Sequence, residues 1–120
     1  MASKRQSQVA SIIKRNFSTV LQQEGSYIYG TQALVTVTNV QVTPDMGEAK
    51  IYLSVFNVED KQTVLLEIED NAGRLKQQLA QRIRKHVRRV PSLQFFLDDT
   101  LDEMYRINEV LDRINTGDNN

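Results

Sequence analysis

Residues 70–91 of this chain read DNAGRLKQQLAQRIRKHVRRVP. Within this stretch one apolar residue recurs at every fourth position, as on the core-facing side of a helix: Leu75, Leu79, Ile83 and Val87. The stretch carries seven of the chain's 15 lysines and arginines, and it has no acid after Asp70. The side opposite Leu79 is polar and basic: Arg74, Gln77, Gln81, Arg84, Lys85 and Arg88. We therefore expect an amphipathic helix whose basic side is suited to following a phosphate backbone.

The helical pattern is interrupted at Asn71-Ala72-Gly73. One interpretation is a glycine tolerated where two helices cross closely. The other is a kink, at which a helix over residues 61–70 ends and a second helix begins with Asn71 as its N-cap. We favour the kink, because Asn and Gly each disfavour a helix interior and here they occur together. A helix start of this kind presents backbone N–H groups beside Arg74 and Lys76, where phosphate is the natural ligand.

Composition excludes several classes of protein. The 120 residues include no cysteine, so disulfides, thiolate metal sites and cysteine nucleophiles are ruled out. No apolar run approaches the ~18 residues of a membrane span, and we expect a soluble cytoplasmic protein without a cofactor. Net charge is zero, but the charges are segregated along the chain. We expect one domain over residues 1–115, followed by a polar tail at 116–120.

The N-terminal half predicts a helix and a hairpin. After residues 1–6, which we expect to fray, apolar residues at helical spacing predict a helix over 7–23 that Gly25 closes. Residues 26–30 are then a loop, whose two tyrosines either cover the core or stack on bases. Alternating residues predict strands over 33–42 and 49–56, joined by a turn in which Gly47 takes the permissive conformation. Strict alternation places Val40 and Val42 on one side of the first strand and Val37 on the other.

The C-terminal part predicts a strand and a last helix. Pro91 ends the basic helix, residues 92–97 form the third strand, and Thr100 with Glu103 has capping-box spacing. The last helix has an apolar side: Leu101, Met104, Tyr105, Val110, Leu111 and Ile114. It is otherwise acidic.

Candidates for catalysis are few. The pair Asp98-Asp99 is better explained by helix capping than as a carboxylate dyad. His86 is the single histidine, and its basic surroundings indicate a boundary or phosphate-side residue rather than a catalytic one. The chain therefore offers binding rather than catalysis.

The predicted order is helix, strand, strand, helix, kink, helix, strand, helix, which is that of a type II KH domain. Four segments carry a closer resemblance, to the ribosome-binding factor A family: Val9-Ala10, LVTVTNVQVTPDMGEAKIYLSVF over 34–56, the NAGRL kink, and RRVPSLQFFLDDTLDEMYRI over 88–107. That family resembles KH domains but replaces their GXXG loop with an Ala-x-Gly kink. Here Asn71 departs from the pattern and Gly73 keeps it. The stretch between Gly73 and Pro91 is also about two residues longer than the family's, which either extends the basic helix or bulges at its end.

The resemblance implies an α+β, KH-like type II domain with a three-stranded sheet packed against helices. It implies a non-enzymatic monomer that binds the small (30S) ribosomal subunit and its precursor 16S rRNA, with ribosomal proteins as further partners, and that assists late 16S rRNA processing and subunit maturation. The alternative is a protein-interaction adaptor that uses segregated basic and acidic faces. The predicted RNA-binding residues are Lys4, Arg5, Lys14, Arg15, Asn71, Ala72, Gly73, Arg74, Lys76, Arg84, Lys85, Arg88 and Arg89.

Overall fold

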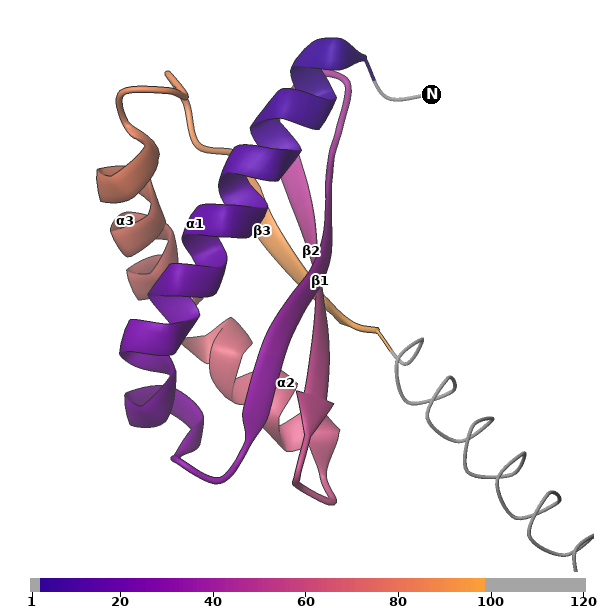
Figure 1. The fold of residues 1–120 in the computed structure, drawn as a ribbon, viewed down its shortest axis with the longest axis vertical. Helices are drawn as coiled ribbons and strands as arrows, with labels where there is room; N and C mark the ends of the chain where they lie inside the picture. Colours follow the sequence, from indigo (N-terminus) through magenta and orange to yellow (C-terminus); the bar gives the residue numbers. More distant parts are fainter. Residues whose placement is uncertain (1–2, 99–120) are drawn as a thin grey trace, which may run out of the picture.

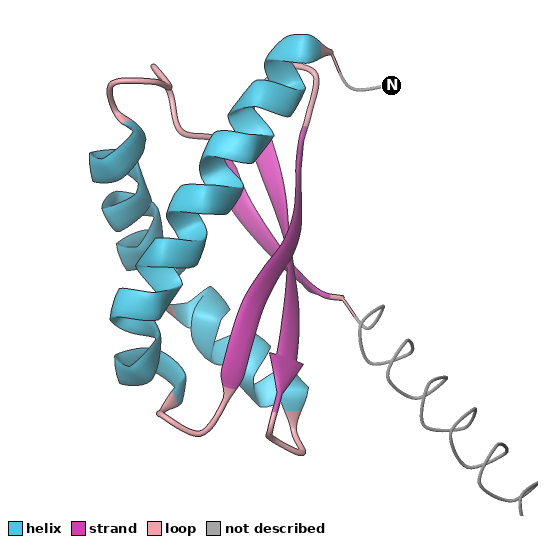
Figure 2. Ribbon diagram, in the orientation of Figure 1, coloured by secondary structure: helices cyan, strands magenta, loops and turns pink. Residues whose placement is uncertain are grey.

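The computed structural model describes residues 3–98, and six elements follow one another along them. They are α1 (Lys4–Tyr29), β1 (Leu34–Val42), β2 (Glu48–Phe56), α2 (Lys61–Asp70), α3 (Ala72–Ile83) and β3 (Ser92–Leu97). The three helices form one layer against a three-stranded sheet (Figures 1 and 2). The α+β class and the order of these six elements are confirmed. The predicted last helix and the polar tail lie outside the described residues.

The sheet has the order β1-β2-β3 and mixed strand directions. The strand β1 pairs antiparallel with β2, as the predicted hairpin requires, whereas β3 pairs in parallel with β2. A parallel partner cannot follow a tight turn, so the chain crosses over through α2 and α3 before it returns as β3. This crossover lays α2 against β2 and β3, and α3 beside α1.

A β-bulge decides which side chains of β1 reach the core. The pairing of β1 with β2 shifts between Val37 and Asn39, so Thr38 is an extra residue. As a result Val37 and Val40 are both buried. Strict alternation places them on opposite sides, and that prediction is wrong. The core face of β2 follows the predicted alternation, with Ala49, Ile51, Leu53 and Val55 all buried.

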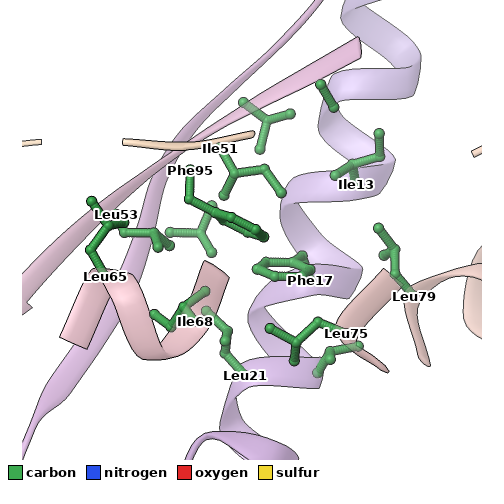
Figure 3. Packing of buried hydrophobic residues seen from close by; sticks show 14 of the residues in the cluster. Ile13, Phe17, Leu21, Ile51, Leu53, Leu65, Ile68, Leu75, Leu79 and Phe95 are labelled. Atoms are coloured by element: carbon green, nitrogen blue, oxygen red, sulfur yellow. The ribbon is translucent and has the colours of Figure 1, made fainter. Parts of the chain in front are cut away.

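The core is centred on Phe17 of α1, which is fully buried. Its ring lies 5.7 Å from that of Phe95 in β3, measured between centroids. Figure 3 shows Ile68 of α2 on one side of this pair and Leu79 of α3 on the other. The predicted apolar side of the basic helix is confirmed, because Leu75, Leu79, Ile83 and Val87 are all buried.

Helix α1 is longer than predicted at its N-terminal end. Ser3 and Gln6 form a reciprocal capping box: the Ser3 hydroxyl accepts from the Gln6 backbone N–H at 3.1 Å, and the Gln6 side chain accepts from the Ser3 N–H at 2.8 Å. The Gln6 amide also donates to the Val42 carbonyl at 2.8 Å. These bonds order residues 3–6, so the prediction that they fray is wrong.

The C-terminal end of α1 also differs from the prediction, because the helix runs through Gly25 to Gly30. Gly25 is buried, and the Tyr29 side chain occupies the space that a side chain at Gly25 would need. Gly30 is the C-cap, with a φ of 87° that favours glycine. The predicted loop is therefore helical. Tyr29 packs, and its burial raises the pKa of its phenol, whereas Tyr27 is 81% exposed.

The turn between β1 and β2 is held by the Asp45 carboxylate. It accepts from the Thr43 hydroxyl at 2.7 Å and from the Gly47 N–H at 2.9 Å, and these bonds lower the pKa of Asp45. Met46, with a φ of 60°, takes the left-handed conformation that the sequence assigns to Gly47. Asp60 caps α2 in a similar way, because the hydroxyl and N–H of Thr63 bind its carboxylate and lower its pKa.

Candidate nucleic-acid interface

The predicted kink lies between α2 and α3, at Asn71. The residue has φ −104° and ψ 14°, so it leaves the helical conformation for one position. Its side chain does not cap α3, contrary to the prediction, but donates back to the Glu67 carbonyl at 2.8 Å. The Asn71 side chain therefore provides a hydrogen-bond donor to a carbonyl in the last turn of α2. Since α3 has no side-chain cap among the described residues, the N–H groups of its first turn remain available to a ligand.

Gly73 lies in the first turn of α3 and is exposed. No heavy atom lies within 4 Å of the position that a Cβ would take there. Neither its conformation nor its packing in residues 3–98 requires glycine. The residue leaves a bare stretch of backbone beside Arg74, which a ligand can approach closely.

An ion pair joins α1 to α3 and shows which residues of the two helices lie level with each other. The Arg74 guanidinium lies 2.9 Å from the Glu24 carboxylate, and the two helices run antiparallel side by side in Figure 1. Because both helices rise by about 1.5 Å per residue, moving ten residues along each from this pair brings residue 84 level with residue 14. The C-terminal end of α3 therefore lies beside the N-terminal half of α1.

This arrangement gathers most of the described cations at one end of the molecule. We call this group the basic end, and all of its side chains are exposed: Lys4, Arg5, Lys14, Arg15, Arg82, Arg84, Lys85, Arg88 and Arg89. Within residues 3–98 none of them forms an ion pair. Arg89 makes a small contribution to the lowered pKa of Asp45. Arg82 is missing from the predicted site, although it belongs to the same run of cations.

The remaining predicted residues lie around the kink, at the other end of α3. Arg74 is held by Glu24, and Asn71, Ala72 and Lys76 are half-buried. Residues 74 and 84 are about 15 Å apart along a helix. The predicted RNA-binding residues thus form two groups, one at the basic end and one around the kink, and an exposed side of α3 connects them.

Helix α3 ends at Ile83, earlier than the predicted end at Pro91. Residues 84–87 form a turn, in which the N–H groups of His86 and Val87 both donate to the Ile83 carbonyl at 2.9 Å. A turn therefore separates the end of α3 from Pro91, and the basic helix does not extend to the proline. Val87 still reaches the core, while Arg84, Lys85 and the exposed His86 project from the turn.

The described part of the chain holds no sign of a metal centre or a membrane span. No group of three or more histidine, cysteine, aspartate or glutamate residues comes together in residues 3–98 to hold a metal ion. Among the same residues, no helix is both long and apolar enough to cross a membrane.

Comparisons with known proteins agree with the fold. The sequence model of a family described as ribosome-binding factor A matches residues 5–111. The ribosome-binding factor A of Cytophaga hutchinsonii is 36% identical over 95% of this chain and 85% of its own length, and that of Flavobacterium johnsoniae is 36% identical over 92% and 85%.

Solved structures are similar as well. The crystal structure of ribosome-binding factor A from Thermus thermophilus matches with a TM-score of 0.64 at 22% identity, covering 77% of this chain and 94% of that one. A Thermus thermophilus homology model of the factor, fitted into the cryo-EM map of a 30S complex, matches with a TM-score of 0.58 at 27% identity, covering 74% and 90%. This chain belongs to the ribosome-binding factor A family.

Proposed function

We propose that this protein binds the small (30S) ribosomal subunit through its rRNA and assists late 16S rRNA processing and subunit maturation in the cytoplasm, without catalysing a reaction itself. The observation that carries the proposal is the basic end, whose nine cations are exposed and unpaired within residues 3–98. The family relationship supports the choice of ligand, since a related factor was fitted into a 30S complex.

The basic end suits phosphate rather than base recognition. Lysine and arginine side chains on exposed helical and turn positions neutralise phosphates and release counterions, which supplies affinity without reading sequence. The kink adds the free N–H groups of α3 and the bare backbone at Gly73. Contacts of this kind recognise the shape of folded rRNA, and the neighbouring ribosomal surface supplies specificity.

The proposal is tested by sedimentation with purified ribosomal particles over a series of salt concentrations. We expect the protein to travel with free small subunits and not with complete ribosomes, and cells that lack it to accumulate precursor 16S rRNA. If six or more phosphates are contacted, affinity falls by roughly 10³- to 10⁵-fold between ~50 and ~200 mM salt. Binding that hardly changes with salt, or partners that stay bound after ribonuclease treatment, would point instead to the protein-interaction adaptor.

A Gly73→Ala variant separates folding from binding. Alanine favours a helix over glycine, and the position is open, so the free energy of unfolding should rise by up to about 1 kcal/mol. Affinity for the small subunit should fall, because the new methyl group covers backbone that the proposal places against RNA. Gln77→Ala, also exposed on α3, is the matched control and should keep wild-type affinity. A Gly73→Ala variant that binds as wild type would remove the kink from the interface.

A Glu24→Gln variant tests whether Arg74 is held back from RNA. The ion pair is exposed on the arginine side, so stability should change by less than about 1 kcal/mol. The released guanidinium becomes available to a phosphate, and the slope of log K against log salt should steepen by about 0.9. Glu69→Gln on α2 makes the same change in net charge without releasing an arginine. Equal slopes for the two variants would show that Arg74 does not reach the RNA.

A further inference from the structure

Tyr27 of α1 is the most exposed large apolar or aromatic side chain in residues 3–98, with 81% of its surface accessible. It follows Glu24 by three residues, so the two side chains are neighbours on the side of α1 that faces α3. Glu24 is largely covered there, since its side chain is 17% exposed and pairs with Arg74. Tyr27 lies one turn further along α1 and is left open.

The position at which α3 begins explains why the Tyr27 ring is left open. Moving three residues along each helix from the ion pair brings residue 27 level with residue 71. Helix α3 begins at Ala72, so it does not extend far enough to cover the ring. The ring therefore stands beside the kink, next to the bare and exposed backbone at Gly73.

The fold makes little use of this ring. Within residues 3–98 the ring of Tyr27 stacks on no other aromatic side chain, and its hydroxyl forms no hydrogen bond. Tyr29 shows the contrast, because its side chain packs over Gly25. A tyrosine side chain has only two χ angles, so holding it against a ligand costs little conformational entropy. Tyr27 is therefore an aromatic surface that the fold leaves available to a ligand.

We propose that Tyr27 is a stacking platform for one unpaired base of the RNA that binds at the kink. The inference rests on the proposed function, which places an RNA backbone against the start of α3, and it adds a contact to a base. Gly73 lies two residues along α3 from the level of Tyr27, or about 3 Å along the helix axis. Packed helices lie about 8–10 Å apart, so one nucleotide can place its phosphate on α3 and its base on the ring.

The neighbouring charges favour this orientation of the nucleotide. Glu69 and Asp70, at the end of α2, are exposed and repel phosphate from that side of the kink. Arg74 and Lys76 lie on α3, where the proposal places the phosphate. A base carries no charge, so the acids do not repel it. Because every base has an aromatic face, Tyr27 selects unpaired over paired nucleotides without selecting the identity of the base.

The affinity for purified free small subunits tests the stacking contact. Tyr27→Leu keeps an apolar side chain but removes the aromatic face, and we expect the affinity to fall by about 5- to 100-fold, as for the loss of one stacked base. Because no charge changes, the slope of log K against log salt should stay that of wild type. Tyr27→Phe keeps the aromatic face and should bind as wild type. Gln23→Ala, an exposed change one turn earlier in α1, is the matched control and should also bind as wild type.

Ultraviolet crosslinking of the wild-type protein on free small subunits identifies the partner of the ring. We expect Tyr27 to be joined to one nucleotide of 16S rRNA, and reverse transcription to stop at a position that is unpaired. Tyr27→Leu with wild-type affinity, or a crosslink to a base-paired nucleotide, would overturn the inference and leave the proposed function intact. Reduced affinity of Tyr27→Leu without a crosslink from Tyr27 to RNA would assign the ring to another partner and overturn it as well. Wild-type binding that does not respond to salt would instead contradict the proposed function itself.

Discussion

Reversing the charges of Arg84 and Arg88 is expected to abolish association with the small ribosomal subunit. Arg84 projects from the turn that follows α3, and Arg88 lies just after that turn. Both side chains are exposed, and neither forms an ion pair within residues 3–98. Changing both to glutamate removes two phosphate contacts and adds two charges that repel the backbone. We expect affinity at moderate salt to fall by about 100-fold or more, and the slope of log K against log salt to become shallower by about 1.8.

The fold should survive this change, because neither side chain contributes to the core. Lys50→Glu is the control, since it reverses a charge on the side of β2 that faces away from the core and should leave sedimentation unchanged. Far-UV circular dichroism and urea unfolding check that all the variants are folded. If the Arg84→Glu, Arg88→Glu variant sediments with the small subunit as wild type does, the basic end is not the RNA-binding surface.

Replacing Phe17 by alanine is expected to have the largest effect on stability. The side chain is fully buried where α1 meets Phe95 of β3, with α2 and α3 packed on either side (Figure 3). Truncating a buried phenylalanine costs about 3–5 kcal/mol, from a total free energy of unfolding of about 5–15 kcal/mol for a domain. We expect the melting temperature to fall by more than about 10 °C.

The matched control is Tyr27→Ala, another aromatic truncation in the same helix. Tyr27 is 81% exposed, so its loss should change the free energy of unfolding by less than about 0.5 kcal/mol. A Phe17→Ala variant that unfolds at nearly the wild-type urea concentration would contradict the packing shown in Figure 3.

Local patterns predict much of this fold. The two strands of the hairpin and their turn are marked by alternation and by Pro44, and α2 has the predicted limits of residues 61–70. The kink is predictable because Asn71 and Gly73 disfavour a continuous helix. The apolar side of α3 is predictable because four residues repeat at a helical period.

The predictions that were wrong failed because they depend on contacts that only the folded chain makes. Gly25 resembles a helix terminator in sequence, but it is the residue over which Tyr29 packs, and only the folded chain shows that contact. The bulge at Thr38 is stabilised by Asp98, sixty residues later in the chain. The end of α3 is misplaced because Val87 keeps the helical period, although it reaches the core from a turn.

The candidate site was predictable in its residues but not in its shape. The cations of α3 could be read from one run of sequence, and those of α1 from another. These two groups of cations lie at one end of the molecule because α1 and α3 pack antiparallel. The ion pair between Glu24 and Arg74 shows how the two helices are aligned along their lengths. The Asn71 side chain binds the end of α2 and does not cap α3. This choice depends on the rotamer of Asn71, which the spacing of residues in the sequence does not specify.

The pairing of Phe17 with Phe95 also bears on how the chain folds as it is synthesised. These rings come from the first and last elements described, so the centre of the core is incomplete until β3 has been made. Before then, β2 has an unpaired edge and α1 has an uncovered aromatic ring. Contacts this distant in sequence slow folding and expose the nascent chain to aggregation. The nascent chain therefore keeps the β2 edge and the Phe17 ring uncovered throughout the synthesis of α2 and α3.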